Sequence, residues 1–298
     1  MKWRGRRQSS NVEVRSGGGG GPRMGGFPLG SGTGGGGRGF PNFGGGIGTG
    51  GLGGLILVVL VVGAFYLFSG GFGEETAGPQ TTTTELTQES QQFLATILAD
   101  TEDAWTEIFA QGGQDYPEPT LVFYEGGTQT ACGFGDAAIG PFYCPGDRNI
   151  YLDLSFLGEL ERDFDAAGDF AQAYIVAHEV GHHIQNITGA LQREQQLAQG
   201  RSEAERNALS VRTELQADCY AGIVGSYMEA QGYLDVGDLN EALNAARQIG
   251  DDAIQMRTQG YVVPESFNHG TSAQRAEWFR RGYESNGNVA ACDTFADL

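Results

Sequence analysis

The stretch AYIVAHEVGHHIQ, residues 173–185, carries the strongest structural and chemical signal in this 298-residue chain. His178 and His182 stand four residues apart, and in a helix this spacing places both imidazoles on one face, where they can bind one metal ion. Glu179 follows His178 directly, so its carboxylate would lie beside that ion and could take a proton from a water molecule there. The stretch therefore predicts a helix with Zn²⁺ ligands at His178 and His182 and a catalytic base at Glu179.

The residues around this motif support a site. Glycine in a helix interior costs about 1 kcal/mol relative to alanine, so Gly181 predicts a close approach of another backbone element, or of substrate, at this face. The alternative is an amphipathic surface helix with incidental histidines, but three of the four histidines of the chain cluster here. His183 is rotated by about 100° from His182, and we expect it to pack or to support a ligand.

A third protein ligand is needed, and the segment directly after His182 does not supply it. The metzincin pattern requires a glycine three residues and a histidine six residues after the second histidine. Gln185 and Thr188 occupy these positions, which excludes that class.

The segment ELQAD, residues 214–218, offers the third ligand from a second helix. Glu214 and Asp218 are one turn apart, so Glu214 can complete a His-His-Glu set while Asp218 accepts the ring N–H of one ligand histidine. Two alternatives stay open: a solvated acidic face, or a thiolate ligand from Cys219. The apolar neighbours of both carboxylates favour burial, and buried carboxylates need partners.

The fourth histidine, His269, precedes a predicted helix that contains Arg275. A histidine in a loop beside a helix N-terminus could stabilise the oxyanion that develops when water attacks a carbonyl. A purely structural role is the alternative.

Hydrophobic spacing predicts an α+β, mostly helical domain over residues 85–298. The motif His178-Glu179-Val180-Gly181-His182, with Glu214 as third ligand, makes the expected domain zincin-like (gluzincin-type), a metalloprotease class. Short strands in LVFY, GPFYC and NIYLDLSF, between residues 119 and 156, predict a small sheet. The remaining pattern predicts helices, and Ser202 with Glu205 forms a capping box that opens the helix bearing ELQAD.

The N-terminal part differs in composition. Glycine dominates residues 16–54, so we expect residues 1–49 to form a disordered, basic cytoplasmic tail. The uncharged run LGGLILVVLVVGAFYLF, residues 52–68, predicts a transmembrane helix over residues 50–71, followed by a linker over 72–84. A cleaved signal peptide is the alternative, but too many residues precede the run. The basic residues before it predict a single-pass inner-membrane protein with a cytoplasmic N-terminus and a periplasmic domain.

Charge and cysteines agree with an exported domain. The chain from residue 74 onward has 11 basic and 36 acidic residues, which makes nucleic acid an unlikely partner. Four cysteines suggest two disulfides, with three possible connectivities. We favour Cys132 with Cys144, which a short loop joins, and Cys219 with Cys292 by elimination.

The sequence resembles the bacterial membrane-anchored neutral zinc metallopeptidase family over nearly its whole length. The resemblance is carried by MKWRGRRQSSNVE, GPFYCPGDRNIYLDLSF, AHEVGHHIQ, ELQADCYAG, GDLNEALNAARQIGDD and HGTSAQRAEWF. It implies zinc ligands at His178, His182 and Glu214 and a base at Glu179.

These features predict a membrane-anchored zinc endopeptidase that acts on envelope polypeptides. We expect the substrate to bind in extended form along an edge strand drawn from Ile150 to Phe156. One alternative is a non-catalytic envelope protein with a structural zinc, which four protein ligands normally close. Another is a zinc amidohydrolase acting on a non-peptide bond.

Overall fold

The structure, a computed structural model, describes residues 1–15, 81–136, 139–162, 164, 166 and 168–298. The α-helices are α2 (Thr81–Gln111), α3 (Ser155–Arg162), α4 (Asp169–Thr188), α5 (Ala190–Ala198), α6 (Glu203–Ala230), α7 (Asp238–Gln248), α8 (Asp251–Gln259) and α9 (Ser272–Glu284). Short 3-10 turns are η2 (Pro264–Ser266) and η3 (Val289–Cys292). The strands are β1 (Val12–Val14), β2 (Thr120–Tyr124), β3 (Gly127–Thr130), β4 (Gly133–Asp136), β5 (Phe142–Cys144) and β6 (Asn149–Asp153). The prediction of a mostly helical domain with a small sheet is confirmed.

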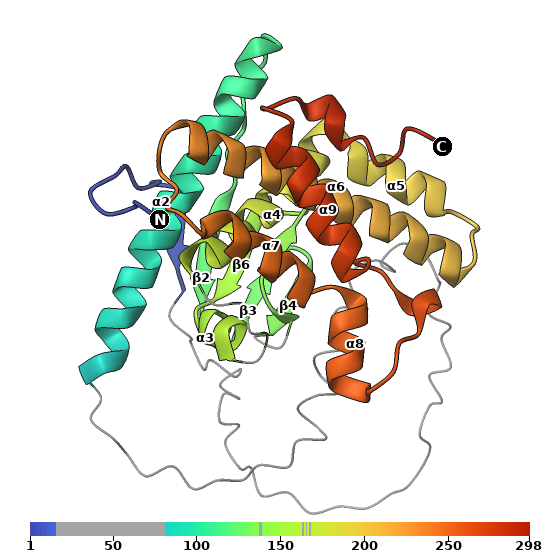
Figure 1. Cartoon of the computed structure of the whole chain (residues 1–298), viewed down its shortest axis with the longest axis horizontal. Coiled ribbons are helices and arrows are strands. Elements are labelled where there is room, and N and C mark those ends of the chain that lie inside the picture. Colours follow the sequence, from blue (N-terminus) through green and yellow to red (C-terminus); the bar gives the residue numbers. More distant parts are fainter. Residues whose placement is uncertain (16–80, 137–138, 163, 165, 167) are drawn as a thin grey trace, which may run out of the picture.

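The sheet has the strand order β1-β2-β6-β5, and β3 and β4 form a separate two-stranded ribbon. β1, β2 and β6 are parallel, whereas β5 is antiparallel to β6. β2 and β6 are almost entirely buried, as expected for parallel strands that are covered on both faces. Helices surround this sheet, and α2 runs along one side of the molecule (Figure 1).

The predicted substrate-binding strand within Ile150–Phe156 is not at an edge of the sheet. β6 pairs with β2 on one side and with β5 on the other. From Ser155 the chain is already helical, in α3. The prediction is wrong because the run NIYLD is apolar enough to be buried on both sides, and the edges fall to β1 and β5.

Residues 1–15 belong to the folded body, so the prediction of a disordered tail over residues 1–49 is wrong for this part. β1 adds to the sheet beside β2, and the N-terminal segment lies along α2 (Figure 1). Arg7 donates to Glu102 of α2 at 2.9 Å. The reason lies in composition, because glycine dominates only after Ser16, whereas the first residues carry basic and polar side chains that find partners on α2.

The predicted membrane span, residues 50–71, lies outside the described residues, as does most of the predicted linker. Within the described ranges, no helix is both long and apolar enough to cross a bilayer. A single crossing between β1 and α2 would separate β1 from β2, yet these strands share one sheet. A cytoplasmic N-terminus with a periplasmic domain is therefore incompatible with this strand pairing.

The α4 helix lies at the centre of the domain and crosses α6 at very close range. A Cβ atom added to Gly181 would lie 2.9 Å from the Cα of Ala217. This explains the glycine inside the motif: a second backbone approaches there, one of the two predicted reasons. On the far side, Gly222 and Gly282 allow α6 and α9 to pack equally closely. Glycines at both crossings thus allow α4 to pack closely on α6 and α6 to pack closely on α9.

The favoured disulfide connectivity is confirmed. Cys132 is bonded to Cys144 and Cys219 to Cys292. The first bond ties the β3–β4 ribbon to β5, and the second ties α6 to η3. With its sulfur in a disulfide, Cys219 is excluded as a thiolate ligand.

Candidate metal centre

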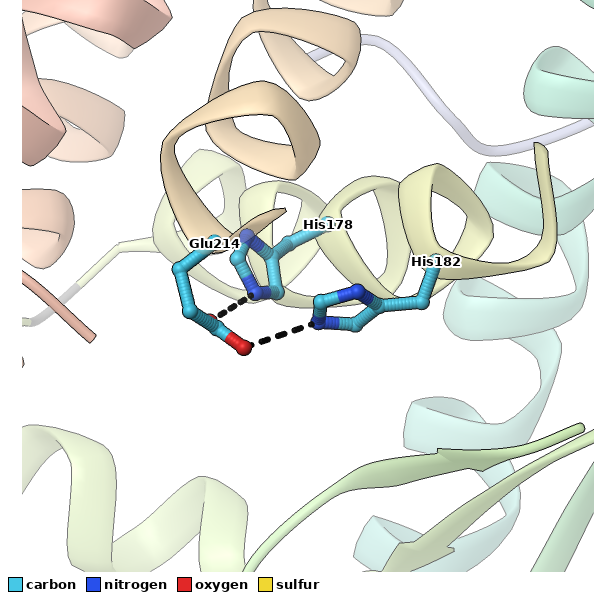
Figure 2. A group of neighbouring side chains, drawn as sticks. All are labelled: His178, His182 and Glu214. Carbon is cyan, nitrogen blue, oxygen red and sulfur yellow. Dashed lines mark hydrogen bonds and ion pairs between the residues drawn. The ribbon is translucent and has the colours of Figure 1, made fainter. Parts of the chain in front are cut away.

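The three predicted ligands meet where α4 crosses α6. The Nε2 atom of His178 lies 3.2 Å from Glu214 Oε2, and the Nε2 atom of His182 lies 3.5 Å from Glu214 Oε1. Both imidazoles point from α4 toward the carboxylate of α6 (Figure 2). Their potential ligand atoms all lie within 4.8 Å of one another.

These separations fit a zinc ion. Two ligand atoms that are each about 2.1 Å from zinc, at a tetrahedral angle, lie about 3.4 Å apart. The donor set of two imidazole nitrogens and one carboxylate oxygen is one that zinc favours in catalytic sites. Among the described residues the cluster has three members and not four. Such a set leaves a coordination position for water.

His178 is oriented by Asp218, as predicted. The Nδ1–H of His178 donates to Asp218 Oδ1 at 2.8 Å, because a carboxylate can only accept. This bond leaves Nε2 to face Glu214. Burial lowers the pKa of His178, but the charges and hydrogen bonds of Asp218 and Glu214 outweigh it and raise the pKa to about 10. A metal ion would have to displace that proton.

Asp218 is itself clamped by two side chains that sequence reasoning did not assign. Arg275 of α9 donates from Nε to Oδ2 at 2.9 Å and from Nη2 to Oδ1 at 3.0 Å. The hydroxyl of Tyr174 donates to Oδ1 at 2.6 Å. Burial raises the pKa of Asp218, but Arg275 and His178 outweigh it and lower the pKa below its ordinary value. The carboxylate is therefore ionised and fully held.

His182 is oriented by a neutral partner on its own helix. Its Nδ1 atom lies 2.9 Å from Oε1 of Gln185. Glu214 faces both histidines, and although burial raises its pKa, the nearby His182, His178 and His269 lower the pKa well below its usual range. Glu214 is thus an ionised ligand candidate.

Glu179 and His183, the other polar residues of the motif, are both buried. Glu179 follows His178 directly on α4, and 7% of its surface is exposed. His183 lies on another side of the helix, where its Nε2 donates to the carbonyl of Pro117 at 2.6 Å and Nδ1 accepts from the Tyr143 hydroxyl at 3.0 Å. Burial lowers the pKa of His183 to about 4. The expectation that His183 packs is confirmed.

His269 lies in the loop before α9, as predicted, and Asp251 fixes it there. Asp251 Oδ1 accepts from His269 Nδ1 at 3.0 Å, while Oδ2 accepts three backbone N–H groups, those of Asn268, His269 and Gly270. Burial lowers the pKa of His269, but Asp251 and the charge of Glu214 outweigh it and raise the pKa. Asp251 engages Nδ1 of His269, which leaves Nε2 as the ring nitrogen that Asp251 does not contact. Sequence reasoning missed Asp251, which sits among several acidic residues without a distinctive pattern.

A groove of about 410 Å³ is lined by residues of α6, of the η2 region and of α9. Its walls include Val211, Leu215, Gly270 and Trp278. Leu215 and Gly270 directly follow Glu214 and His269 in sequence, but neither site residue lines the groove.

A second acidic group, Asp169, Asp238 and Glu241, also has metal-ligand spacing. Its carboxylates already have partners. The α-amine of Met1 lies 2.7 Å from Asp169 and 3.4 Å from Asp238, and Glu241 accepts the backbone N–H of Phe170. This group is explained by the contacts between the N-terminal segment, α4 and α7.

The fold and the first cluster form a candidate His-His-Glu metal site on two helices, with the donor set that zinc-dependent hydrolases use. The family described as "Putative neutral zinc metallopeptidase" matches residues 1–295, and the chain belongs to this family. The family description implies zinc for this site.

Relatives cover the chain to different extents. "Uncharacterized protein YpfJ" of Escherichia coli (strain K12) is 48% identical over 303 residues, which span 99% of both chains. "Uncharacterized protein Rv2575" of Mycobacterium tuberculosis (strain ATCC 25618 / H37Rv) is 44% identical over 196 residues, 61% of this chain and 65% of the relative. No solved structure matches the chain.

Proposed function

We propose that the protein is a zinc-dependent endopeptidase that hydrolyses peptide bonds of envelope polypeptides. The observation that carries this proposal is the three-membered cluster of His178, His182 and Glu214. Three protein ligands leave a tetrahedral zinc ion one position for a substrate or water. Structural zinc sites normally have four protein ligands, so three ligands favour a hydrolytic site over a purely structural one.

Bound to the three ligands, zinc would polarise the scissile carbonyl and make a nearby water more acidic. Glu179 takes one proton from the attacking water while the water oxygen bonds to the carbonyl carbon. Glu179 then gives this proton to the leaving amine nitrogen as the C–N bond breaks. His269 donates a hydrogen bond from Nε2 to the developing oxyanion, and Asp251 holds the ring for this role.

The substrate would bind along β5 rather than β6. β5 is an edge strand, paired within the described sheet only with β6. It also packs near α4, because Asn186 of α4 donates to the hydroxyl of Tyr143 in β5 at 2.8 Å. An extended peptide can add to such an edge through main-chain hydrogen bonds.

We also propose inner-membrane association through residues 50–71, with residues 1–15 and the domain together on the periplasmic side. Two disulfides suit an oxidising compartment, and the pairing of β1 with β2 supports a location of both parts on one side. Cysteines introduced at the exposed Lys2 and Glu203 should both react with an impermeant maleimide in spheroplasts. Labelling of Glu203→Cys but not Lys2→Cys would refute the shared side.

The central experiment is Glu179→Gln in the full-length chain, with zinc content and peptide-library cleavage measured together. We expect retained zinc and a loss of cleavage of about 10²- to 10⁴-fold. Glu203→Gln, at an exposed position in the first turn of α6, is the matched control and should keep activity. A zinc-loaded Glu179→Gln protein with the parent's cleavage rate would refute the mechanism.

A further inference from the structure

A chain of buried amides runs from His182 to a backbone carbonyl beyond α6. Gln185 accepts from His182 Nδ1 at 2.9 Å through its Oε1 atom. The Nε2 of Gln185 donates to the carbonyl of Thr213 at 2.7 Å and to Oε1 of Gln216 at 3.1 Å. The Nε2 of Gln216 in turn donates to the carbonyl of Cys292 at 3.1 Å. Two glutamines therefore connect a predicted zinc ligand to η3.

The direction of every hydrogen bond in this chain is fixed by its ends. A backbone carbonyl can only accept, so the carbonyls of Thr213 and Cys292 require the amide nitrogens of both glutamines to face them. The Gln185 oxygen is then left facing the His182 ring. Because that oxygen can only accept, the proton of a neutral His182 must sit on Nδ1. This tautomer leaves the lone pair of Nε2 pointing at Glu214, where zinc would bind.

Burial makes the alternative orientations costly. Gln185 is 0% and Gln216 7% exposed, so neither amide can exchange its partners for bulk water. Rotating either amide by 180° would place an oxygen against a carbonyl oxygen and leave an N–H without an acceptor. The chain thus specifies one arrangement.

The Cys219–Cys292 disulfide holds the far end of the chain. It ties Cys292, whose carbonyl accepts from Gln216, to α6. Cys219 also directly follows Asp218, the partner of His178. The covalent bond therefore joins the supports of both histidines.

We propose that Gln185 and Gln216 are positioning residues that set the tautomer and orientation of His182, with the Cys219–Cys292 disulfide fixing the end of their chain. This inference rests on the proposed role of His182 as a zinc ligand. Gln185 stands where the metzincin pattern has a glycine, and it is not itself a predicted metal ligand. Here it acts on the second histidine from one turn further along the helix.

The test measures zinc affinity of the full-length protein by competition with a chromophoric chelator. Gln185→Leu should bind zinc about 10- to 100-fold more weakly, the range typical for loss of a partner that orients a ligand. Gln216→Leu should have a smaller effect, because Thr213 still orients Gln185. Gln192→Leu, on α5 and bonded only at the surface to Asn186, is the control and should leave affinity unchanged.

The two disulfides provide a second matched pair. Cys219→Ala/Cys292→Ala should weaken zinc binding by up to about 10-fold, and adding Gln216→Leu should weaken it little further, since both changes break the same chain. Cys132→Ala/Cys144→Ala should leave zinc affinity at the parent value. Equal zinc affinities for the two disulfide variants would argue against the proposed link.

A measurement on the parent protein does not depend on whether the variants fold. In the zinc-loaded parent, ¹⁵N NMR of the histidine rings should show Nδ1 of His182 protonated and Nε2 bound to metal. Zinc on Nδ1, or a folded Gln185→Leu protein with the parent's zinc affinity, would overturn the inference. Failure of the proposed function looks different, because zinc affinity would then still depend on Gln185 while no peptide is cleaved. Zinc binding that is indifferent to His182→Ala would instead remove the premise of this inference.

Discussion

The two histidines of the metal cluster lie one turn apart on α4 but are held by opposite kinds of partner. His178 bonds to the ionised Asp218, which Arg275 and Tyr174 clamp in turn. His182 bonds to the neutral Gln185, whose orientation is set by backbone carbonyls. The His178 support therefore depends on balanced buried charge, and the His182 support depends on amide orientation. Both histidines present Nε2 to the metal position, but an ionic hydrogen bond orients His178 and a neutral one orients His182.

Removing Arg275 should have the largest effect on stability, because it disturbs the His178 support and leaves the His182 support intact. Arg275→Met leaves the buried Asp218 carboxylate without its bidentate partner and with the His178 ring as the other cation bonded to it. Breaking a buried ion pair in this way typically costs about 3–5 kcal/mol. Urea unfolding of the metal-free chain, followed by circular dichroism, measures this loss. Arg280→Met, which removes an exposed pair with Glu277, should change stability by less than about 1 kcal/mol. Similar losses for the two variants would mean that the Asp218 charge does not need Arg275.

Asp218→Asn attacks the same support from the carboxylate side. We expect zinc affinity to fall about 10- to 100-fold, because the amide oxygen accepts less strongly from His178 and the amide N–H groups face the donors of Arg275. Chelator competition gives the affinity and urea unfolding the stability. Combining Asp218→Asn with Arg275→Met should lose less stability than the two single changes together. Strict additivity would show that these residues do not act as a pair.

Gly181→Ala should disturb both supports equally, since it lies where α4 meets α6. The added methyl group would press on the backbone of Ala217, and such overpacking costs about 1–3 kcal/mol. Gly158→Ala in α3 is the control, because its Cβ would meet no atom within 4 Å. The control should be neutral or stabilising by up to about 1 kcal/mol. A neutral Gly181→Ala variant would mean that the two helices can move apart freely.

The contrast between the supports also explains what could be predicted from sequence. Local spacing places His178, Glu179 and His182 on one helix, and the i, i+4 pair Glu214 and Asp218 on another. A shared metal then requires the two helices to meet. The close approach at Gly181 followed from the cost of glycine in a helix interior, so the crossing could be foreseen.

The remaining contacts could not be predicted, because they join residues far apart in sequence that lack a periodic signal. Arg275 lies 57 residues from Asp218, and Cys292 lies 76 residues from Gln216. A single arginine or glutamine on a helix has no pattern that distinguishes a buried partner from a solvated one. The prediction for the N-terminal residues was wrong for another reason. These residues were grouped with the glycine-rich segment that follows, although three residues are enough for β1 to add to the edge of the sheet.

X-ray absorption spectroscopy of the zinc-loaded, full-length protein would show directly which atoms surround the zinc ion. The site should show nitrogen and oxygen neighbours at about 2.0–2.2 Å and no sulfur at about 2.3 Å, with one neighbour supplied by exchangeable solvent. Glu214→Gln should alter this spectrum and weaken zinc binding. A sulfur neighbour, a fourth protein ligand, or a spectrum unchanged by Glu214→Gln would contradict an open His-His-Glu site.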